Sequence, residues 1–123
     1  MKVSELTGEK LDYWVARIVN PGGYYVIEDD GVCWEIDPPR TDGYCSGRRI
    51  LSRSFQPSTE WFDLGPLIDK FKINIEWVDD GKYCSAFIKP VTGPDDVRFG
   101  QTPQIAACRA IVASVYGEEV DDE

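Results

Sequence analysis

Apolar positions recur at helical spacing in three segments of the chain. The first follows Thr7, a residue type that commonly caps helix N-termini, and the second follows residues 57–59. The third begins at Thr102-Pro103, a cap followed by the residue that best fits the first helical position. The apolar positions are Leu11, Trp14, Val15 and Ile18, then Leu64, Leu67, Ile68 and Phe71, and finally Ile105, Cys108, Val112, Val115 and Tyr116. Three helices are therefore predicted.

Two other regions alternate apolar and polar residues at the period of a β-strand. Each contains an Asp-Asp-Gly turn, at residues 29–31 and 79–81, and the Asp-Gly step supplies the positive φ values of a tight hairpin. The predicted strands cover residues 24–28, 32–36, 73–77 and 82–89. In the first hairpin we expect Val32, Trp34 and Ile36 to share the face that meets the core.

The order of these elements predicts an α+β fold, in which an antiparallel β-sheet built from two hairpins packs with about three α-helices. Residues 37–54 and 90–100 are rich in turn-forming residues and are predicted to be loops. We expect one domain over residues 1–117, followed by an acidic disordered tail over residues 118–123. The last helix is expected to bury Ile105, Cys108, Val112 and Val115 against a sheet that contains Trp77 and Phe87.

Charge and composition narrow the classes of function. The net charge of −9 at pH 7 repels phosphate backbones, so direct binding of nucleic acid is not expected and a basic partner is favoured. The chain has no His, which removes the usual general base of Ser-His and Cys-His nucleophilic sites. No apolar run approaches the about 20 residues that span a bilayer, so we expect a cytoplasmic protein without a membrane partner.

The four cysteines do not form a recognisable metal site. None lies in a C-x-x-C pair, and without His a zinc site would have to gather four isolated ligands. We therefore expect reduced, buried thiols and predict neither a metal nor a cofactor. The residues are Cys33, Cys45, Cys84 and Cys108.

Several motifs resemble the phage NinX-like family of unknown function. They are MKVSELTG at residues 1–8, LDYWVA at 11–16, PSTEW at 57–61, GPLI at 65–68 and GQTPQIAACRA at 100–110. Residues 55–116 also resemble the phage α-β-α sandwich domain. The resemblance implies a phage or prophage accessory protein in the cytoplasm of an infected bacterium. The chain departs from the family pattern at Glu60, where Asp is expected, and in a longer arginine-rich loop at residues 40–53.

A small set of residues is suited to contact a ligand or a partner protein. Hydroxyls and an aromatic ring near a helix start suit a small polar ligand, although they also suit helix capping. Arginines suit an anion, although Arg109 also suits an internal ion pair and the others a solvated loop. Tyr13 faces away from the stripe that contains Trp14, so it is a candidate contact. The candidates are Tyr13, Ser58, Thr59, Trp61, Arg109, Arg40, Arg48, Arg49 and Arg53.

These features favour a non-enzymatic phage accessory protein that binds a host protein. One role consistent with this is that of an acidic inhibitor of a defence or nucleic-acid-processing system. The first alternative is a module that binds or sequesters a small, nucleotide-like anion. The second is a His-independent, metal-assisted enzyme, which is disfavoured because the acidic pairs are explained by the hairpin turns.

Overall fold

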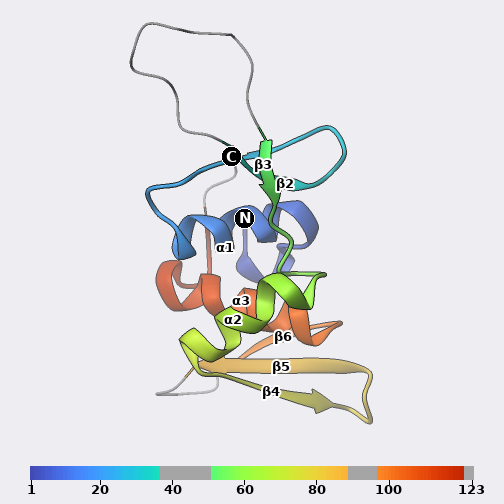
Figure 1. The fold of residues 1–123 in the computed structure, drawn as a ribbon. Coiled ribbons are helices and arrows are strands. Elements are labelled where there is room, and N and C mark those ends of the chain that lie inside the picture. Colours follow the sequence, from blue (N-terminus) through green and yellow to red (C-terminus); the bar gives the residue numbers. More distant parts are fainter. Residues whose placement is uncertain (37–50, 89–96, 121–123) are drawn as a thin grey trace, which may run out of the picture.

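The computed structural model describes residues 1–36, 51–88 and 97–120, and Figure 1 shows their arrangement. The described elements are three α-helices, one short 3-10 helix and two three-stranded antiparallel sheets, which confirms the α+β class. In chain order they are η1 (Val3–Glu5), α1 (Gly8–Val19), β1 (Tyr24–Ile27), β2 (Cys33–Ile36), β3 (Leu51–Ser54), α2 (Trp61–Phe71), β4 (Ile73–Val78), β5 (Tyr83–Ile88), β6 (Arg98–Gly100) and α3 (Pro103–Tyr116).

Helix α3 lies at the centre of the fold. One side packs on β4, β5 and β6, and other sides contact α1 and α2 (Figure 1). Small side chains permit this close packing, because Ala106, Ala107 and Ala110 are all buried. The start of α3 matches the expected cap, since the Ile105 amide donates to Thr102 Oγ1 at 3.2 Å. Gly117 then follows the helix with a positive φ of 80°.

Each predicted hairpin is confirmed, but each gains a third strand and the two form separate sheets. Strand β3 lies within the predicted loop 37–54 and pairs with β2, while β6 lies within the predicted loop 90–100 and pairs with β5. Both added strands are short, at four and three residues. Because their pairing is with distant residues, local pattern alone did not reveal them.

The face predicted for the second strand is wrong. Cys33 is fully buried, whereas Trp34 and Ile36 on the opposite face are only half-buried. Helix α1 contacts β1 and β2, which gives this small sheet its apolar side. The indole of Trp34 instead donates from Nε1 to Asp30 Oδ2 in the hairpin turn, at 3.1 Å. The indole nitrogen of the largest side chain on the strand thus has a polar partner at the turn.

The predicted packing of α3 is right at its middle and wrong at its end. Cys108 and Val112 are buried and Ile105 packs against the core, but Val115 is 55% exposed. The last turn of α3 leaves the sheet and meets α1, where the Tyr116 ring lies 5.2 Å from the Trp14 ring in an edge-to-face contact. The expected sheet partners also differ. Trp77 is exposed, and the β4–β5 register places Phe87 opposite Asn74, on the other sheet face from Ile73 and Ala86.

The first residues pair with residues 118–120. The Val3 amide donates to Glu118 O at 2.8 Å, and the Val120 amide donates to Met1 O at 2.9 Å. Val120 is also buried in the core. The solvated tail expected from Glu118 onward is therefore wrong for residues 118–120, because one apolar residue anchors them. Residues 121–123 lie outside the described part.

Helix α2 contains a proline in its interior. Pro66 cannot donate the backbone hydrogen bond to Phe62 O, and its ring restricts the residue before it. That residue is Gly65, which has no Cβ to clash with the proline ring. In the described part of the chain, no helix has the length and apolarity required to cross a membrane.

Candidate functional site

A buried carboxylate joins the first helix to the segment before α2. Asp12 is 3% exposed, and its Oδ1 atom accepts a hydrogen bond from the Ser58 amide at 2.8 Å. Burial raises the pKa of Asp12 from 3.8 to about 6, although the hydrogen bond from the Ser58 amide acts in the opposite direction. The Ser58 hydroxyl is itself buried, and its Oγ atom makes no regular hydrogen bond to the described residues.

A second carboxylate, Asp63, fixes the start of α2. Its Oδ1 atom accepts from Arg53 at 2.6 Å, and its Oδ2 atom accepts from the Gln56 amide at 2.9 Å. The Arg53 guanidinium also lies over the Phe55 ring, 5.9 Å from its centroid. We name Asp12, Arg53, Gln56, Ser58 and Asp63 the polar junction, because together they tie α1, β3 and α2 to one backbone segment.

An open cavity of about 500 Å³ lies beside the polar junction. Its lining carries one guanidinium and two carboxylates, and the guanidinium is already paired with one of the carboxylates. A bound dianion here would meet the negative charge of Glu60, so the local field disfavours a phosphate-like ligand. The lining residues are Arg53, Ser54, Gln56, Glu60, Phe62 and Asp63.

Two adjacent aromatic side chains project from the first turn of α2. Trp61 is 51% exposed and Phe62 is 85% exposed. Glu60, which precedes them as the N-cap residue, is exposed and makes no side-chain cap hydrogen bond. We name Glu60, Trp61 and Phe62 the α2 aromatic surface. It is the part of the candidate site that can contact another molecule without rearrangement.

The two hydroxyl candidates do not cap α2, as their position near the helix start had suggested. Ser58 is buried and acts through its backbone amide, as described above, while Thr59 is exposed two residues before the helix begins. Of the predicted site residues, Arg53 and Ser58 belong to the polar junction, and Trp61 belongs to the adjoining α2 aromatic surface.

Arg109 is a structural clamp in the described chain. Its Nε atom donates to Leu6 O at 3.1 Å and a terminal nitrogen donates to Phe99 O at 2.7 Å, so it joins the segment before α1 to β6. Burial lowers its pKa. The prediction of an internal role is supported, although the acceptors are backbone carbonyls and not a carboxylate.

Replacing Arg109 with Met is expected to lower the free energy of unfolding by about 1–2 kcal/mol, because two charge-assisted hydrogen bonds are lost while the aliphatic stem is kept. Urea denaturation followed by tryptophan fluorescence measures the change. The matched control is Arg17→Met, which removes an exposed guanidinium stacked 4.9 Å from the Trp14 ring centroid. Equal losses in the two variants would contradict the clamp.

The remaining candidates are not brought into this site. Tyr13 is half-buried and packs edge-to-face on Trp14, with ring centroids 6.0 Å apart. Arg40, Arg48 and Arg49 lie outside the described residues, as does Cys45. In residues 1–36, 51–88 and 97–120, no group of three or more Cys, Asp or Glu side chains is placed to hold a metal ion.

The three described cysteines are buried, as expected. Burial raises the pKa of Cys33 to about 12 and that of Cys108 well above its usual value. The negative charge of Asp12 acts in the same direction on both thiols. Neither is therefore present as the thiolate that nucleophilic chemistry needs.

A comparison with protein families shows the family to which the chain belongs. The family described as "Bacteriophage P22, NinX" matches residues 2–115. The chain belongs to this phage NinX family. The match confirms the resemblance seen in the sequence motifs and makes the chain a phage accessory protein. A search of curated proteins finds no match.

Three residues of the candidate site were not singled out from the sequence, namely Asp12, Phe62 and Asp63. Phe62 carried a usable signal, because it lies off the apolar stripe of α2 and a large apolar side chain there must face outward. Asp12 carried a weaker one, since a carboxylate beside Leu11 and three residues before Val15 sits at the edge of a buried stripe. Asp63 looks like an ordinary first-turn acid.

Proposed function

We propose that this phage protein binds a host protein through the α2 aromatic surface. The observation that carries the proposal is the exposure of two neighbouring aromatic rings on one helical turn. Single exposed apolar residues are common on protein surfaces, but adjacent aromatic rings are typical of the few residues that dominate binding energy.

The backbone that presents these rings is held firmly. Asp63 bonds both Arg53 and the Gln56 amide, and Asp12 bonds the Ser58 amide, so the segment before Trp61 is tied on two sides. Binding would therefore freeze few backbone torsions, which keeps the entropy cost of association low. The polar junction has a structural role in this proposal, and the aromatic rings have the contact role.

The charge around the rings favours a basic partner. Glu60 adjoins the two rings, and the whole chain carries a net charge of −9. Aromatic faces attract guanidinium and ammonium groups, and a neighbouring carboxylate adds an ion pair. A surface rich in arginine or lysine, such as the nucleic-acid channel of a defence or nucleic-acid-processing enzyme, fits this chemistry. Occupying such a channel would inhibit the enzyme.

The prediction is tested by comparing proteins captured from host lysate by three versions of the chain. We expect Phe62→Ala to reduce capture of the specific partner at least about tenfold, the loss typical of a hot-spot residue. Tyr24→Ala removes another exposed aromatic side chain, from β1, and is expected to leave capture unchanged. Phe62 is so exposed that its truncation should not alter the unfolding curve.

The partner found in this way is then purified and its association rate measured at increasing salt. Electrostatic steering predicts that salt slows association more than it speeds dissociation, and that Glu60→Gln weakens the dependence. Equal capture by the wild type and Phe62→Ala would refute the aromatic contact. Binding lost only when Arg40, Arg48, Arg49 and Arg53 are replaced would favour the alternative, a small anion held by the arginine-rich loop.

A further inference from the structure

Strand β4 lies at an edge of its sheet. The described residues pair it with β5 alone, and Figure 1 shows β4 at the border of the fold. It is six residues long and contains no proline. Such an edge presents unpaired backbone N–H and C=O groups, which can pair with another strand.

The end of this strand carries an exposed indole on the face that elsewhere forms the core. Side chains alternate along a strand, so Ile73, Ile75 and Trp77 share a face. Ile73 is buried and Ile75 packs against the core, but Trp77 is 61% exposed. The described elements therefore leave uncovered the largest side chain on the inner face of β4.

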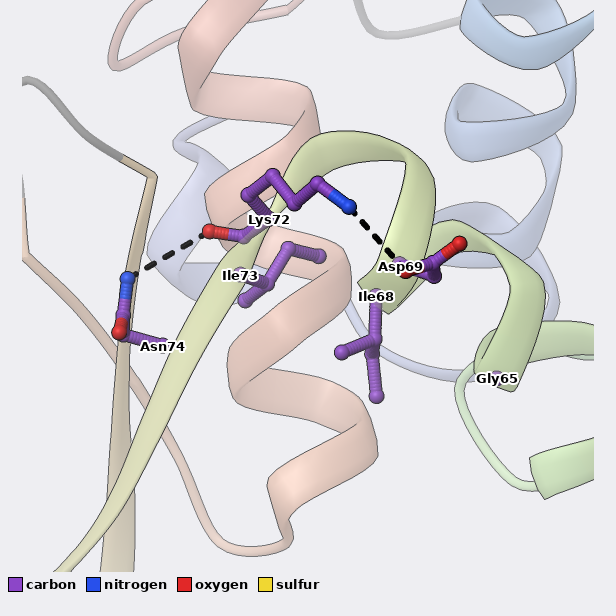
Figure 2. Close-up of a pocket in the computed structure, with 6 residues that line it drawn as sticks. All are labelled: Gly65, Ile68, Asp69, Lys72, Ile73 and Asn74. Carbon is purple, nitrogen blue, oxygen red and sulfur yellow. Dashed lines mark hydrogen bonds and ion pairs between the residues drawn. The ribbon is translucent and has the colours of Figure 1, made fainter.

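The other end of the same strand borders a cavity of about 530 Å³, which is shown in Figure 2. Ile68 and Ile73 give it apolar walls, and the Lys72–Asp69 ion pair of 3.2 Å lies on its rim. Gly65 lines the cavity without a side chain, and a Cβ added there would meet no heavy atom within 4 Å. The remaining lining residue is Asn74.

We propose that β4 pairs antiparallel with β4 of a second copy of this chain, and that Trp77 of each copy binds at this cavity of the other. The pairing is centred on Ile75, which lies opposite its own counterpart. Ile73 then lies opposite Trp77 of the second copy, and Asn74 lies opposite Glu76. The two sheets join into one of six strands. The interface is independent of the α2 aromatic surface.

The strand's own chemistry favours this register over one centred on Glu76. Residues directly opposite each other in an antiparallel pair lie on the same face of the sheet. Odd-numbered residues of one copy, which lie on the inner face of β4, must therefore lie opposite odd-numbered residues of the other. Moving the centre to Glu76 would place two carboxylates directly opposite each other, which is unfavourable. With the centre at Ile75, an amide faces a carboxylate and an isoleucine faces an indole.

The charges that flank β4 fit the same antiparallel arrangement. Lys70 and Lys72 precede the strand and, with Asp69, give that end a net charge of +1. Asp79 and Asp80 follow it and, with Lys82, give the other end a net charge of −1. Antiparallel self-pairing brings the basic end of one copy beside the acidic end of the other, at both ends of the interface. This electrostatic complementarity favours a second copy over an unrelated apolar strand as the occupant.

Sedimentation of the full chain at increasing concentration tests the dimer. We expect twice the monomer mass at about 100 µM, and we expect Trp77→Ala to weaken dimerisation at least about tenfold. The matched control is Phe99→Ala, which truncates a 50% exposed ring on the opposite edge strand β6 and should leave the dimer unchanged. A monomer at every concentration, or equal effects of the two variants, would overturn the proposal.

Crosslinking tests the register independently. Asn74→Cys combined with Glu76→Cys places two thiols opposite each other across the interface, so mild oxidation should give a covalent dimer. Each single change places its thiol opposite a residue that cannot crosslink, and should leave the chain uncrosslinked. Native cysteines are common to all three variants. A double variant that stays monomeric, or single variants that crosslink equally well, would contradict this pairing.

Discussion

Replacing Val112 with Asp is expected to unfold the domain, whereas the same change at Val115 should leave it folded. Val112 is 0% exposed and lies in the part of α3 that packs between the sheet and the other helices. An unpaired carboxylate there costs about 4 kcal/mol or more, which is close to the whole stability of a small domain. At Val115 the carboxylate stays in water, and the change should be within about 0.5 kcal/mol.

Circular dichroism and urea denaturation of the two variants measure this difference directly. Both variants add the same charge to the same helix, three residues apart, so helix propensity and net charge are matched. A folded Val112→Asp protein with an unchanged urea midpoint would show that α3 does not pack as described. Unfolding of both variants would show that its last turn is buried.

A second large effect is expected from Asp12, with a dependence on pH. Its pKa in the folded chain is about 6, above its usual 3.8, so the folded state holds the proton more tightly than the unfolded chain does. This contribution to stability is complete below about pH 4 and is lost as the pH rises through 6. A difference of about 2 pKa units corresponds to about 3 kcal/mol.

Asp12→Asn is therefore expected to raise the free energy of unfolding by up to about 3 kcal/mol at pH 8 and to change it little near pH 4. The amide keeps an oxygen that can accept from the Ser58 amide, but it cannot ionise. Urea denaturation at pH 4.5, 6 and 8 measures the effect.

Asp69→Asn is the control, because this carboxylate is exposed and forms only a surface ion pair with Lys72. Its variant should follow the wild-type pH profile. An Asp12→Asn protein that is less stable than the wild type at pH 8 would contradict this prediction. The folded state would then be stabilised by the charged form of Asp12 and not by the neutral form.

The helices were predictable because their signals are local. Thr102 and Gly117 mark the two ends of α3 through backbone chemistry within a few residues of each end. The Asp-Gly turns likewise predict both hairpins, although the positive φ values differ: Asp79, Asp80 and Gly81 have them in the second turn, and only Gly31 has one in the first.

What the sequence did not reveal depends on distant partners. Strands β3 and β6 exist because β2 and β5 offer them an edge, and their own residues carry little strand pattern. The inward face of β2, which carries the buried Cys33, depends on the approach of α1. This is an outcome of tertiary packing that alternation alone cannot rank.

The candidate site likewise combines residues with local sequence signals and residues whose roles depend on distant partners. Trp61 was singled out because an aromatic ring beside hydroxyls near a helix start suits a ligand, and Arg53 because it belongs to an arginine-rich segment that suits an anion. Asp12 was missed because its role depends on Ser58, which is 46 residues away in the chain. Arg109 was found as a polar residue, but its two acceptors, Leu6 O and Phe99 O, became visible only in the folded chain.

The pairing of residues 1–3 with residues 118–120 also makes folding depend on contacts that are far apart in the sequence. The Val3 amide bonds Glu118 O and the Val120 amide bonds Met1 O. Pairs of such long sequence separation form only after a large loop has closed, which costs chain entropy and slows folding. Val3 and Leu6 are buried in the folded chain, so we expect their side chains to be covered late in folding.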